Sequence, residues 1–392
     1  MPTDQRDLDL VLFGATGFTG GLTADYLAEN GPSGLRWALA GRSQAKLEAV
    51  RNRLVARHPD LGDLELVVVD AADETELVDV VRRAKVAVTT VGPYQQLGGP
   101  LVAACAETGT DYVDLTGEPE FVDVTYVEQH QTAVASGARI VHACGFDSIP
   151  HDLGAYFTVK ELQATGPVTL RGVVRAAGTA SGGTFHSAMG AFSRAKQMSA
   201  AAKARRRVQG KPADGRRSRA VAGKPHRDKV LGYWLLPMPT IDPQVVARSG
   251  AALPAYGPDF RYSHYAGTKT LRYAAGGMAA VSFVAVAAQV GPARKFLLTR
   301  VPQGQGPDEA KRSKSWFTVE FVAESGDRTL RTKVSGGDPG YGETAKMLAE
   351  SALCLAFDDN PPTAGSVTTA EAMGDNLLTR LSARGITFEV VG

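Results

Sequence analysis

The sequence predicts an α/β protein with an N-terminal doubly wound parallel sheet and a second, mixed α/β domain. Two observations predict this. Apolar runs alternate with helix-like segments through the first 145 of 392 residues, and the first apolar run leads directly into a glycine-rich loop, "GATGFTG" at 14–20. Strand and helix alternating at this spacing are typical of a parallel sheet with crossover helices.

Six apolar runs and five helix-like segments make up the alternation. The runs are continuous ("LVLF", "LVVV"), which indicates strands covered on both faces of the sheet. The expected strands are 8–13, 36–40, 65–69, 85–90, 111–115 and 139–143, and the expected helices lie near 18–30, 44–57, 74–83, 98–108 and 120–136.

The glycine loop stands at the first strand-to-helix turn, where a Rossmann domain binds a dinucleotide. Gly14 permits the tight turn, Gly17 lets the backbone approach a pyrophosphate, and Gly20 allows close packing of helix on strand. The helix N-terminus offers free N–H groups to the phosphates. The spacing is G-x-x-G-x-x-G rather than G-x-G-x-x-G, and a packing loop without ligand is the alternative. The expected contacts of the loop are Gly14, Ala15, Thr16, Gly17, Phe18 and Gly20.

The end of the second strand, "WALAGRS", points to NADP. An NAD site usually has an acidic residue there for the ribose 2′-hydroxyl. Here Arg42 and Ser43 follow instead, and a guanidinium suits a 2′-phosphate; a solvated arginine is the alternative. Asp70, after the third strand, is expected near the adenine or as a helix N-cap.

The fourth strand ends in "TTVGPYQQLGGP". Gly92 and Pro93 are expected to form the floor beside the nicotinamide ribose, and Tyr94 to point toward the substrate cleft. A rigid turn is the alternative for this loop.

Several motifs together resemble the saccharopine dehydrogenase-like family, in its mycobacterial trans-acting enoyl reductase branch. They are "GATGFTG", "LAGRS", "TTVGPY", "GTDYVDLTGE", "ACGFDSIPHDLG", "SGGT", "GYGETAKMLAESALCLA" and "AEAMGDNLLTRL". The resemblance implies an NADP-binding Rossmann domain, a mixed second domain, and a C-terminus packing back toward the first. It also implies reduction of a carbon–carbon double bond in a polyketide made by a separate synthase, with a small-molecule or carrier-bound acyl substrate.

Enoyl reduction requires donors for the enolate oxygen and a proton for the α-carbon. Five residues are candidates for these roles, in the loops after the strands and in "SGGT": Tyr94, Thr116, Glu118, Ser181 and Thr184. The "SGGT" residues are equally explained as a helix N-cap. In "GFDSIPHDLG", Asp147 or His151 could relay a proton, but turn and cap roles for Asp147 and Asp152 are favoured.

The expected division is 1–150 for the cofactor domain, 151–340 for the substrate domain with a dimer contact, and 341–392 for helices returning to the first domain. Strands are expected at 168–176, 316–323 and 328–335, the last two joined by a turn at "ESGD". "SGGT" is expected to open a helix running to about residue 200.

Charge and cysteine content exclude several classes of protein. Three separated cysteines indicate neither a disulfide framework nor a zinc cluster, and no metal is expected. The first ten residues show no signal core, so a cytoplasmic location is expected. Residues 194–229 carry a local net charge of +11 against +2 for the whole chain. Without interleaved aromatic residues, this segment is expected to be a mobile solvated loop rather than a nucleic-acid site.

Residues 273–293 form an uncharged run rich in Ala, Gly and Val. A buried or interfacial helix, a membrane-surface helix and a true span remain open. We expect a helix or helical hairpin near the substrate entrance, held peripherally on anionic lipid by the basic segment with Arg294, Lys295 and Arg300. Two rival functions remain: a saccharopine-type amino-acid dehydrogenase, and a non-catalytic NADP-binding scaffold at a membrane or synthase.

Overall fold

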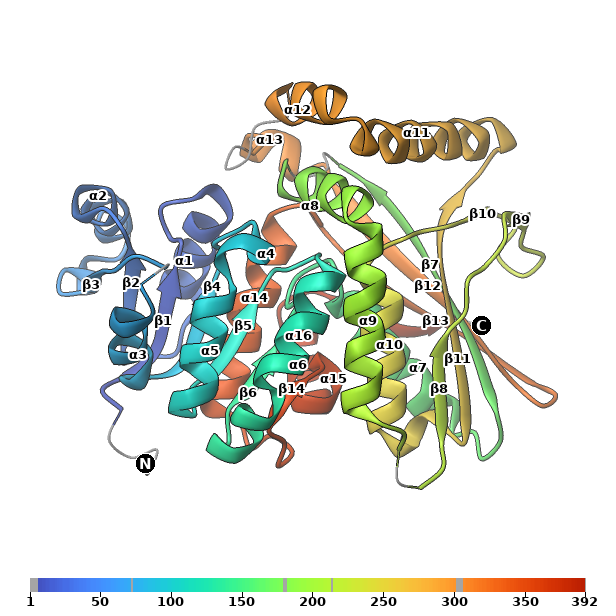
Figure 1. Ribbon diagram of the computed structural model, residues 1–392, viewed down its shortest axis with the longest axis horizontal. Helices are drawn as coiled ribbons and strands as arrows, with labels where there is room; N and C mark the ends of the chain where they lie inside the picture. The colour runs from blue at the N-terminus through green and yellow to red at the C-terminus, as the bar shows by residue number, and fades with distance from the viewer. Residues whose placement is uncertain (1–5, 72, 179–181, 213, 301–305, 392) are drawn as a thin grey trace.

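Two sheets stand side by side and are joined by helices (Figure 1). The structure is a computed structural model, and it describes residues 6–71, 73–178, 182–212, 214–300 and 306–391. The N-terminal sheet lies on the left in Figure 1, and the long strands of the second sheet lie on the right.

The first sheet has seven parallel strands in the order β14-β6-β5-β4-β1-β2-β3. This is the strand order of the dinucleotide-binding doubly wound fold with one strand added at its edge. Its first six strands are β1 (Leu8–Phe13), β2 (Trp37–Gly41), β3 (Glu65–Val68), β4 (Ala84–Thr89), β5 (Asp111–Asp114) and β6 (Arg139–Val141).

The crossover helices form where the sequence predicts them, because the apolar runs between them are buried on both faces of the sheet. The predicted fold class is confirmed: a parallel doubly wound sheet and a second, mixed sheet. The helices are α1 (Phe18–Asn30), α2 (Gln44–Val55), η2 (Pro59–Leu61), α3 (Glu74–Arg82), α4 (Tyr94–Leu97), α5 (Gly99–Thr108) and α6 (Pro119–Ser136).

The second sheet has eight strands of mixed direction, in the order β15-β13-β12-β7-β11-β10-β9 with β8 beside β11. Strands β12 and β13 form the hairpin expected around "ESGD". The strands are β7 (Val168–Ala177), β8 (Arg217–Ala220), β9 (His226–Arg227), β10 (Trp234–Pro237), β11 (Asp259–Thr268), β12 (Trp316–Ser325), β13 (Arg328–Gly336) and β15 (Thr387–Val391).

Helices of the second half cover this sheet and fill the space between the two sheets. Helix α7 packs on β12 and β13, and α10 packs on β8 and β11. The helices are α7 (Ile149–Leu162), α8 (Gly182–Ser193), α9 (Ala195–Gln209), α10 (Asp242–Ala252), η3 (Pro254–Tyr256), α11 (Leu271–Gln289), α12 (Gly291–Arg300) and α13 (Glu309–Arg312).

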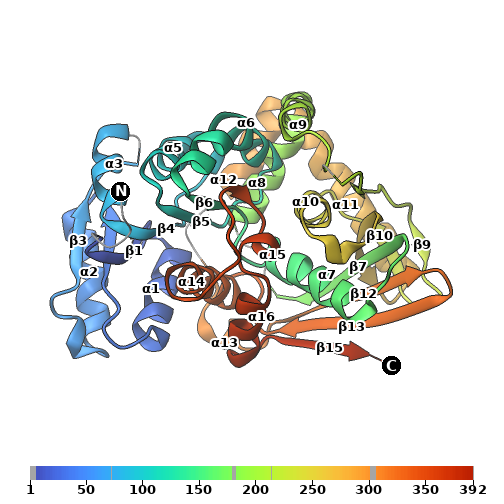
Figure 2. The same ribbon diagram turned by 90° about the horizontal axis from the view of Figure 1, so that it is seen from below.

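The C-terminal segment ties the two sheets together. Helix α14 (Gly342–Phe357) lies between α1 and α16 (Gly374–Ala383), as Figure 2 shows. Strand β14 (Gly365–Val367) then extends the first sheet beside β6, α15 (Thr369–Ala372) follows it, and β15 adds an edge to the second sheet. Glu350 fixes α14 in place, since its buried carboxylate accepts hydrogen bonds from Tyr26 and Arg380.

The basic segment 194–229 is not the mobile loop expected from its composition. Residues 195–209 form α9, which packs along α6. Carboxylates of α6 neutralise its charges: Arg194 makes a two-bond contact with Glu120, and Arg205 pairs with the buried Asp123. The prediction was wrong because these acidic partners lie more than 70 residues earlier in the chain and are invisible to local composition.

The apolar run is helical but not buried. Helices α11 and α12 lie across the top of the molecule in Figure 1, above α8. Only 17% of the most apolar window of α11 is buried, and the helix is long and apolar enough to cross a membrane by length and composition. Tyr273 is 70% exposed and Phe283 64%. The alternative of a buried core helix is therefore wrong.

Candidate active site

A cavity of about 840 Å³ lies between the carboxyl ends of the first sheet's strands and the second sheet. Ligands of doubly wound sheets bind at this end of the strands. One part of its wall is the glycine loop and the β4–α4 turn, and the opposite part comes from β7, α8, α9, α10 and β11. The apolar lining residues include Phe146, Val174, Ala176, Phe192, Met198, Met238 and Ile241.

The glycine loop has the geometry that a pyrophosphate requires. Gly14 has a φ of +87°, which disfavours any residue with a side chain. A Cβ at Gly20 would lie 2.1 Å from the carbonyl oxygen of Gly14, so helix and turn touch only because residue 20 is glycine. At Gly17 a Cβ would meet nothing closer than 3.4 Å, and residues 17–20 line the cavity. The start of α1, which has no side-chain cap, thus presents free N–H groups to the cavity.

The other loop residues have different surroundings. Ala15 is buried in the core behind the turn. The ring of Phe18 lines the cavity and makes an edge contact with Tyr341 at 4.9 Å between centroids, so the loop touches the C-terminal segment. Thr16 is exposed beside the turn.

Arg42 and Ser43 stand where the 2′-phosphate of NADP would lie. Arg42 follows β2 directly, is exposed, and makes no hydrogen bond or ion pair with any residue that the structure describes. Ser43 caps α2 by accepting from the N–H of Lys46. Asp70 lies exposed after β3, and the N-cap of the following helix is Asp73 rather than Asp70.

The β4–α4 loop borders the cavity through Gly92, Pro93 and the ring of Tyr94. The Tyr94 hydroxyl, however, is turned into the protein. It donates to the carbonyl oxygen of Thr89 and accepts from the N–H of Leu115, both at 3.2 Å. Burial raises its pKa well above the ordinary value. These contacts favour a structural role for the hydroxyl.

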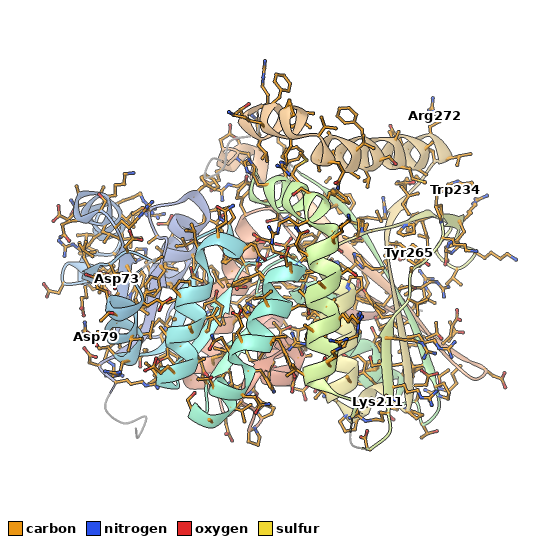
Figure 3. The ribbon with its side chains drawn as sticks, viewed as in Figure 1. Asp73, Asp79, Lys211, Trp234, Tyr265 and Arg272 are labelled. Atoms are coloured by element: carbon orange, nitrogen blue, oxygen red, sulfur yellow. The ribbon has the colours of Figure 1, made fainter. Side chains whose placement is uncertain are left out.

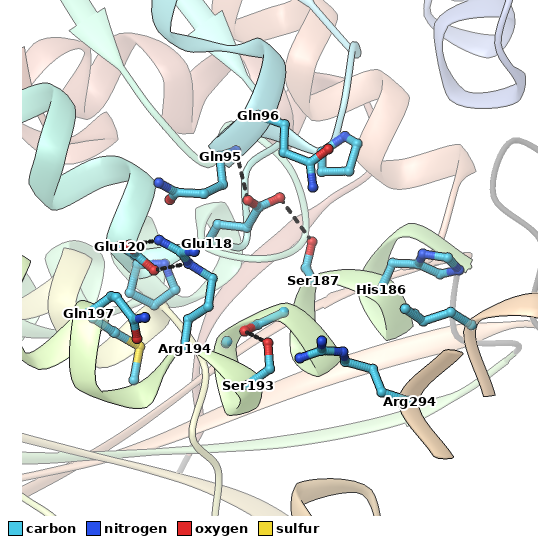
Figure 4. A pocket seen from close by; sticks show the side chains of 16 residues that line it. Gln95, Gln96, Glu118, Glu120, His186, Ser187, Ser193, Arg194, Gln197 and Arg294 are labelled. Carbon is cyan, nitrogen blue, oxygen red and sulfur yellow. Dashed lines mark hydrogen bonds and ion pairs between the residues drawn. The ribbon is translucent and has the colours of Figure 1, made fainter. Parts of the chain in front are cut away.

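Thr116 and Glu118 likewise have partners within the protein. Thr116 is fully buried, and its hydroxyl accepts from the N–H of Glu118. The Glu118 carboxylate accepts from the N–H groups of Tyr94 and Gln95 and from the hydroxyl of Ser187 (Figure 4). It therefore satisfies the free N–H groups at the start of α4.

Glu118 also separates the cavity from a polar basin of about 630 Å³, shown in Figure 4. The two hollows share lining residues such as Glu118 and Ser187. Arg294 points into the basin from α12 rather than toward the outer face of that helix. The basin is lined by polar side chains that include Gln95, Gln96, His186, Ser193, Arg194 and Gln197.

The "SGGT" residues are only partly placed. Ser181 lies outside the described residues. Thr184 belongs to the first turn of α8, and its side chain lies outside the described part of the structure. The helix expected up to about residue 200 is two helices, α8 and α9, which meet at Arg194.

A cluster of four titratable residues forms the far wall of the cavity: Asp147, His151, Asp242 and His264. Asp242 Oδ1 lies 2.7 Å from His151 Nδ1, and Asp242 Oδ2 lies 3.7 Å from His264 Nε2. His264 Nδ1 contacts the hydroxyl of Tyr262 at 3.1 Å. Sequence reasoning noted Asp147 and His151 but missed the other two, which come from α10 and β11 and carry no local motif.

The environment separates the two carboxyl groups of this cluster. Burial and the nearby charge of Asp242 raise the pKa of Asp147 to about 7. Burial would also raise the pKa of Asp242, but His151 and His264 outweigh it and hold that pKa below the ordinary value. Burial lowers the pKa of His264 to about 4. Such a divided pair is typical of an acid and an ion sharing one site.

His151, Asp242 and His264 also offer ligand atoms within 4.8 Å of one another, so this group could hold a metal ion. The other polar residue of the motif is structural. Asp152 accepts hydrogen bonds from Ser249, Thr369 and the N–H of Ala370, as the favoured interpretation predicted.

The doubly wound sheet, the open glycine loop and the adjoining cavity define a dinucleotide-dependent oxidoreductase with a separate substrate-binding sheet. Residues 10–141 match the family model of the saccharopine dehydrogenase NADP binding domain. NADP is thus the cofactor, as predicted from Arg42.

The whole chain has close relatives. A Mycobacterium tuberculosis protein is 37% identical over 99% of both chains. Proteins named trans-acting enoyl reductase from Mycobacterium ulcerans strain Agy99 and M. tuberculosis strain H37Rv are 35% and 36% identical over 98% of both chains. The chain belongs to the trans-acting enoyl reductase family, which confirms the predicted resemblance.

One solved structure shows the same fold over almost the full length. Saccharopine dehydrogenase (L-Glu forming) from Saccharomyces cerevisiae superposes with a TM-score of 0.56 at 13% identity, covering 98% of this chain and 100% of that chain.

Proposed function

We propose that the protein reduces the carbon–carbon double bond of an enoyl thioester, using NADPH, in trans to the synthase that made the substrate. NADPH when bound supplies the hydride to the β-carbon. The glycine loop would hold the pyrophosphate, and Arg42 the 2′-phosphate. The names of the full-length relatives support both the reaction and a substrate brought by a separate synthase.

The observation that carries the proposal is the apolar cavity adjoining the NADP-binding loop. A long acyl chain gains roughly 0.8 kcal/mol per buried CH₂ group in such surroundings. A saccharopine-type substrate would instead require several basic side chains. Among the described lining residues of the cavity, Arg175 is the one Arg or Lys, and it bonds the Tyr233 hydroxyl and stacks on that ring.

The polar basin suits the arm of a carrier-bound thioester. Such an arm is hydrophilic and carries amides and a phosphate, whereas its acyl chain is apolar. The basin opens onto the cavity past Glu118 and offers amide side chains and the guanidinium of Arg294. An acyl group in the cavity and its arm in the basin would thus each meet matching surroundings.

The test is oxidation of NADPH, followed by its absorbance, with purified protein and enoyl thioesters of increasing chain length. We expect turnover that improves with chain length and a saturated product. No oxidation with any enoyl thioester, together with normal NADPH binding, would favour the scaffold alternative. Turnover of an amino acid and a keto acid instead would favour the saccharopine-type alternative.

The outer face of α11 and α12 is proposed to rest on an anionic membrane surface. Tyr273, Phe283, Val286 and Phe296 are all more than half exposed on these helices. Arg272 points outward at the start of α11 in Figure 3, and Lys295 is exposed on α12. Apolar side chains with flanking cations are typical of an interfacial helix. A peripheral contact of this kind would bring the cavity close to a lipid-like substrate.

A further inference from the structure

We propose that the carboxyl group of Asp147 is the acid that protonates the α-carbon of the substrate, and that Asp242, held between His151 and His264, keeps this acid protonated between turnovers. The proposal rests on the enoyl reduction proposed above and names the proton donor that the reaction needs.

The position of Asp147 suits this role. It follows β6 at the carboxyl end of the first sheet, beside the loop that carries Gly117, and it lines the cavity. Its carboxyl group packs against Gly117, where an added Cβ would lie 3.7 Å from the carboxyl carbon. The carboxyl group accepts no hydrogen bond from any described residue, in contrast to Glu118 and Asp152. Its oxygens are thus available to a molecule in the cavity.

The groups that face Asp147 explain why it holds a proton. Asp242 on α10 and Asp114 on β5 disfavour its charge, His151 on α7 favours it, and burial tips the balance to a pKa of about 7. Asp242 stays ionised because His151 and His264 surround it, and it starts α10, whose dipole favours an anion there. The negative charge of Asp242 is therefore fixed, and it discourages a second one at Asp147.

The proton and electron count closes with these groups alone. Hydride adds to the β-carbon, and its electron pair forms the new C–H bond while the π pair moves toward the thioester oxygen. The enolate then collapses, its α-carbon takes the proton of Asp147, and the saturated thioester, NADP⁺ and the Asp147 carboxylate remain. Asp147 regains its proton from solvent, so one solvent proton is consumed per turnover.

The experiment compares wild type, Asp147→Asn and Asp79→Asn with an enoyl thioester substrate. Asp79 makes the matched control, since it undergoes the same chemical change on α3, at the outer edge of the first sheet in Figure 3. We expect Asp147→Asn to lower kcat by about 100-fold or more, while KM and the Kd of NADPH change less than threefold. Asp79→Asn should behave as wild type.

The pH profile gives a second readout that a structural role would not produce. A protonated Asp147 is the active form, so wild-type kcat/KM should fall above about pH 7, approaching tenfold per pH unit. Asp242→Asn removes the charge that raises the pKa of Asp147, so the falling limb should move to lower pH. Product formed in D₂O should carry one deuterium at the α-carbon.

Each other outcome overturns a defined part of the argument. A wild type that oxidises no NADPH with any enoyl thioester overturns the proposed function and this inference together. An active wild type with Asp147→Asn within threefold of it, or with a flat profile between pH 6 and 9, overturns the inference alone. Stoichiometric zinc in the purified protein, with activity lost on chelation, would assign the cluster to a metal and overturn it as well.

Discussion

Arg42→Ala should weaken NADPH binding by about 10- to 150-fold and leave NADH binding nearly unchanged. A charge-assisted hydrogen bond contributes about 1.5–3 kcal/mol, and 1.4 kcal/mol corresponds to a factor of ten in Kd. Because Arg42 is exposed and bonds no described residue, its removal costs the fold no contact. The lost free energy should therefore appear in cofactor binding and not in stability.

The assay is a fluorescence or calorimetric titration of both cofactors against wild type, Arg42→Ala and Arg42→Lys. Arg42→Lys keeps the charge but loses the two-pronged contact, so its affinity should lie between the other two. A melting temperature within about 2 °C of wild type would show that the fold is intact. Equal Kd values for NADPH and NADH in the wild type would refute the reasoning.

Three further predictions follow from the geometry. Gly17→Val should keep the fold and lose NADPH binding, whereas Gly20→Val should also cost about 1–3 kcal/mol of stability through its backbone clash; urea unfolding and cofactor titration separate them, and normal NADPH binding by Gly17→Val would contradict the loop's role. Glu118→Ala should lower stability by about 1–2 kcal/mol through the lost N–H contacts; a hundredfold loss of kcat at unchanged stability would instead make Glu118 catalytic. Flotation with anionic vesicles should be salt-sensitive and abolished by Phe283→Asp with Val286→Asp; no binding at low salt refutes the surface, and binding that survives salt and carbonate indicates a span.

The first half of the fold could be predicted because its signals are local. Strands such as 8–13 are buried on both faces, so they are written as unbroken apolar runs with glycine punctuation between them. The cofactor loop is readable for the same reason, since Gly14 and Gly20 answer steric demands within one turn.

The catalytic cluster could not be predicted because its members meet only in space. Asp242 opens a helix in "TIDPQ" and His264 sits within a strand in "RYSHYA", and neither stretch has a pattern of its own. The same applies to α9, where Arg205 is neutralised by Asp123 from a distant helix. A preference for turn and cap roles therefore held for Asp152, and left open the cavity position of Asp147.

The return of the chain to the first sheet has a consequence for biosynthesis. During translation, strands β1 to β6 leave the ribosome long before β14, so the nascent cofactor domain carries an unpaired sheet edge while the whole second half is being made. Exposed edges invite pairing with other chains. Until β14 and α14 emerge, this edge and the bare faces of α1 and β4 are natural ligands for a chaperone, and expression of the first 150 residues alone should give an aggregation-prone protein.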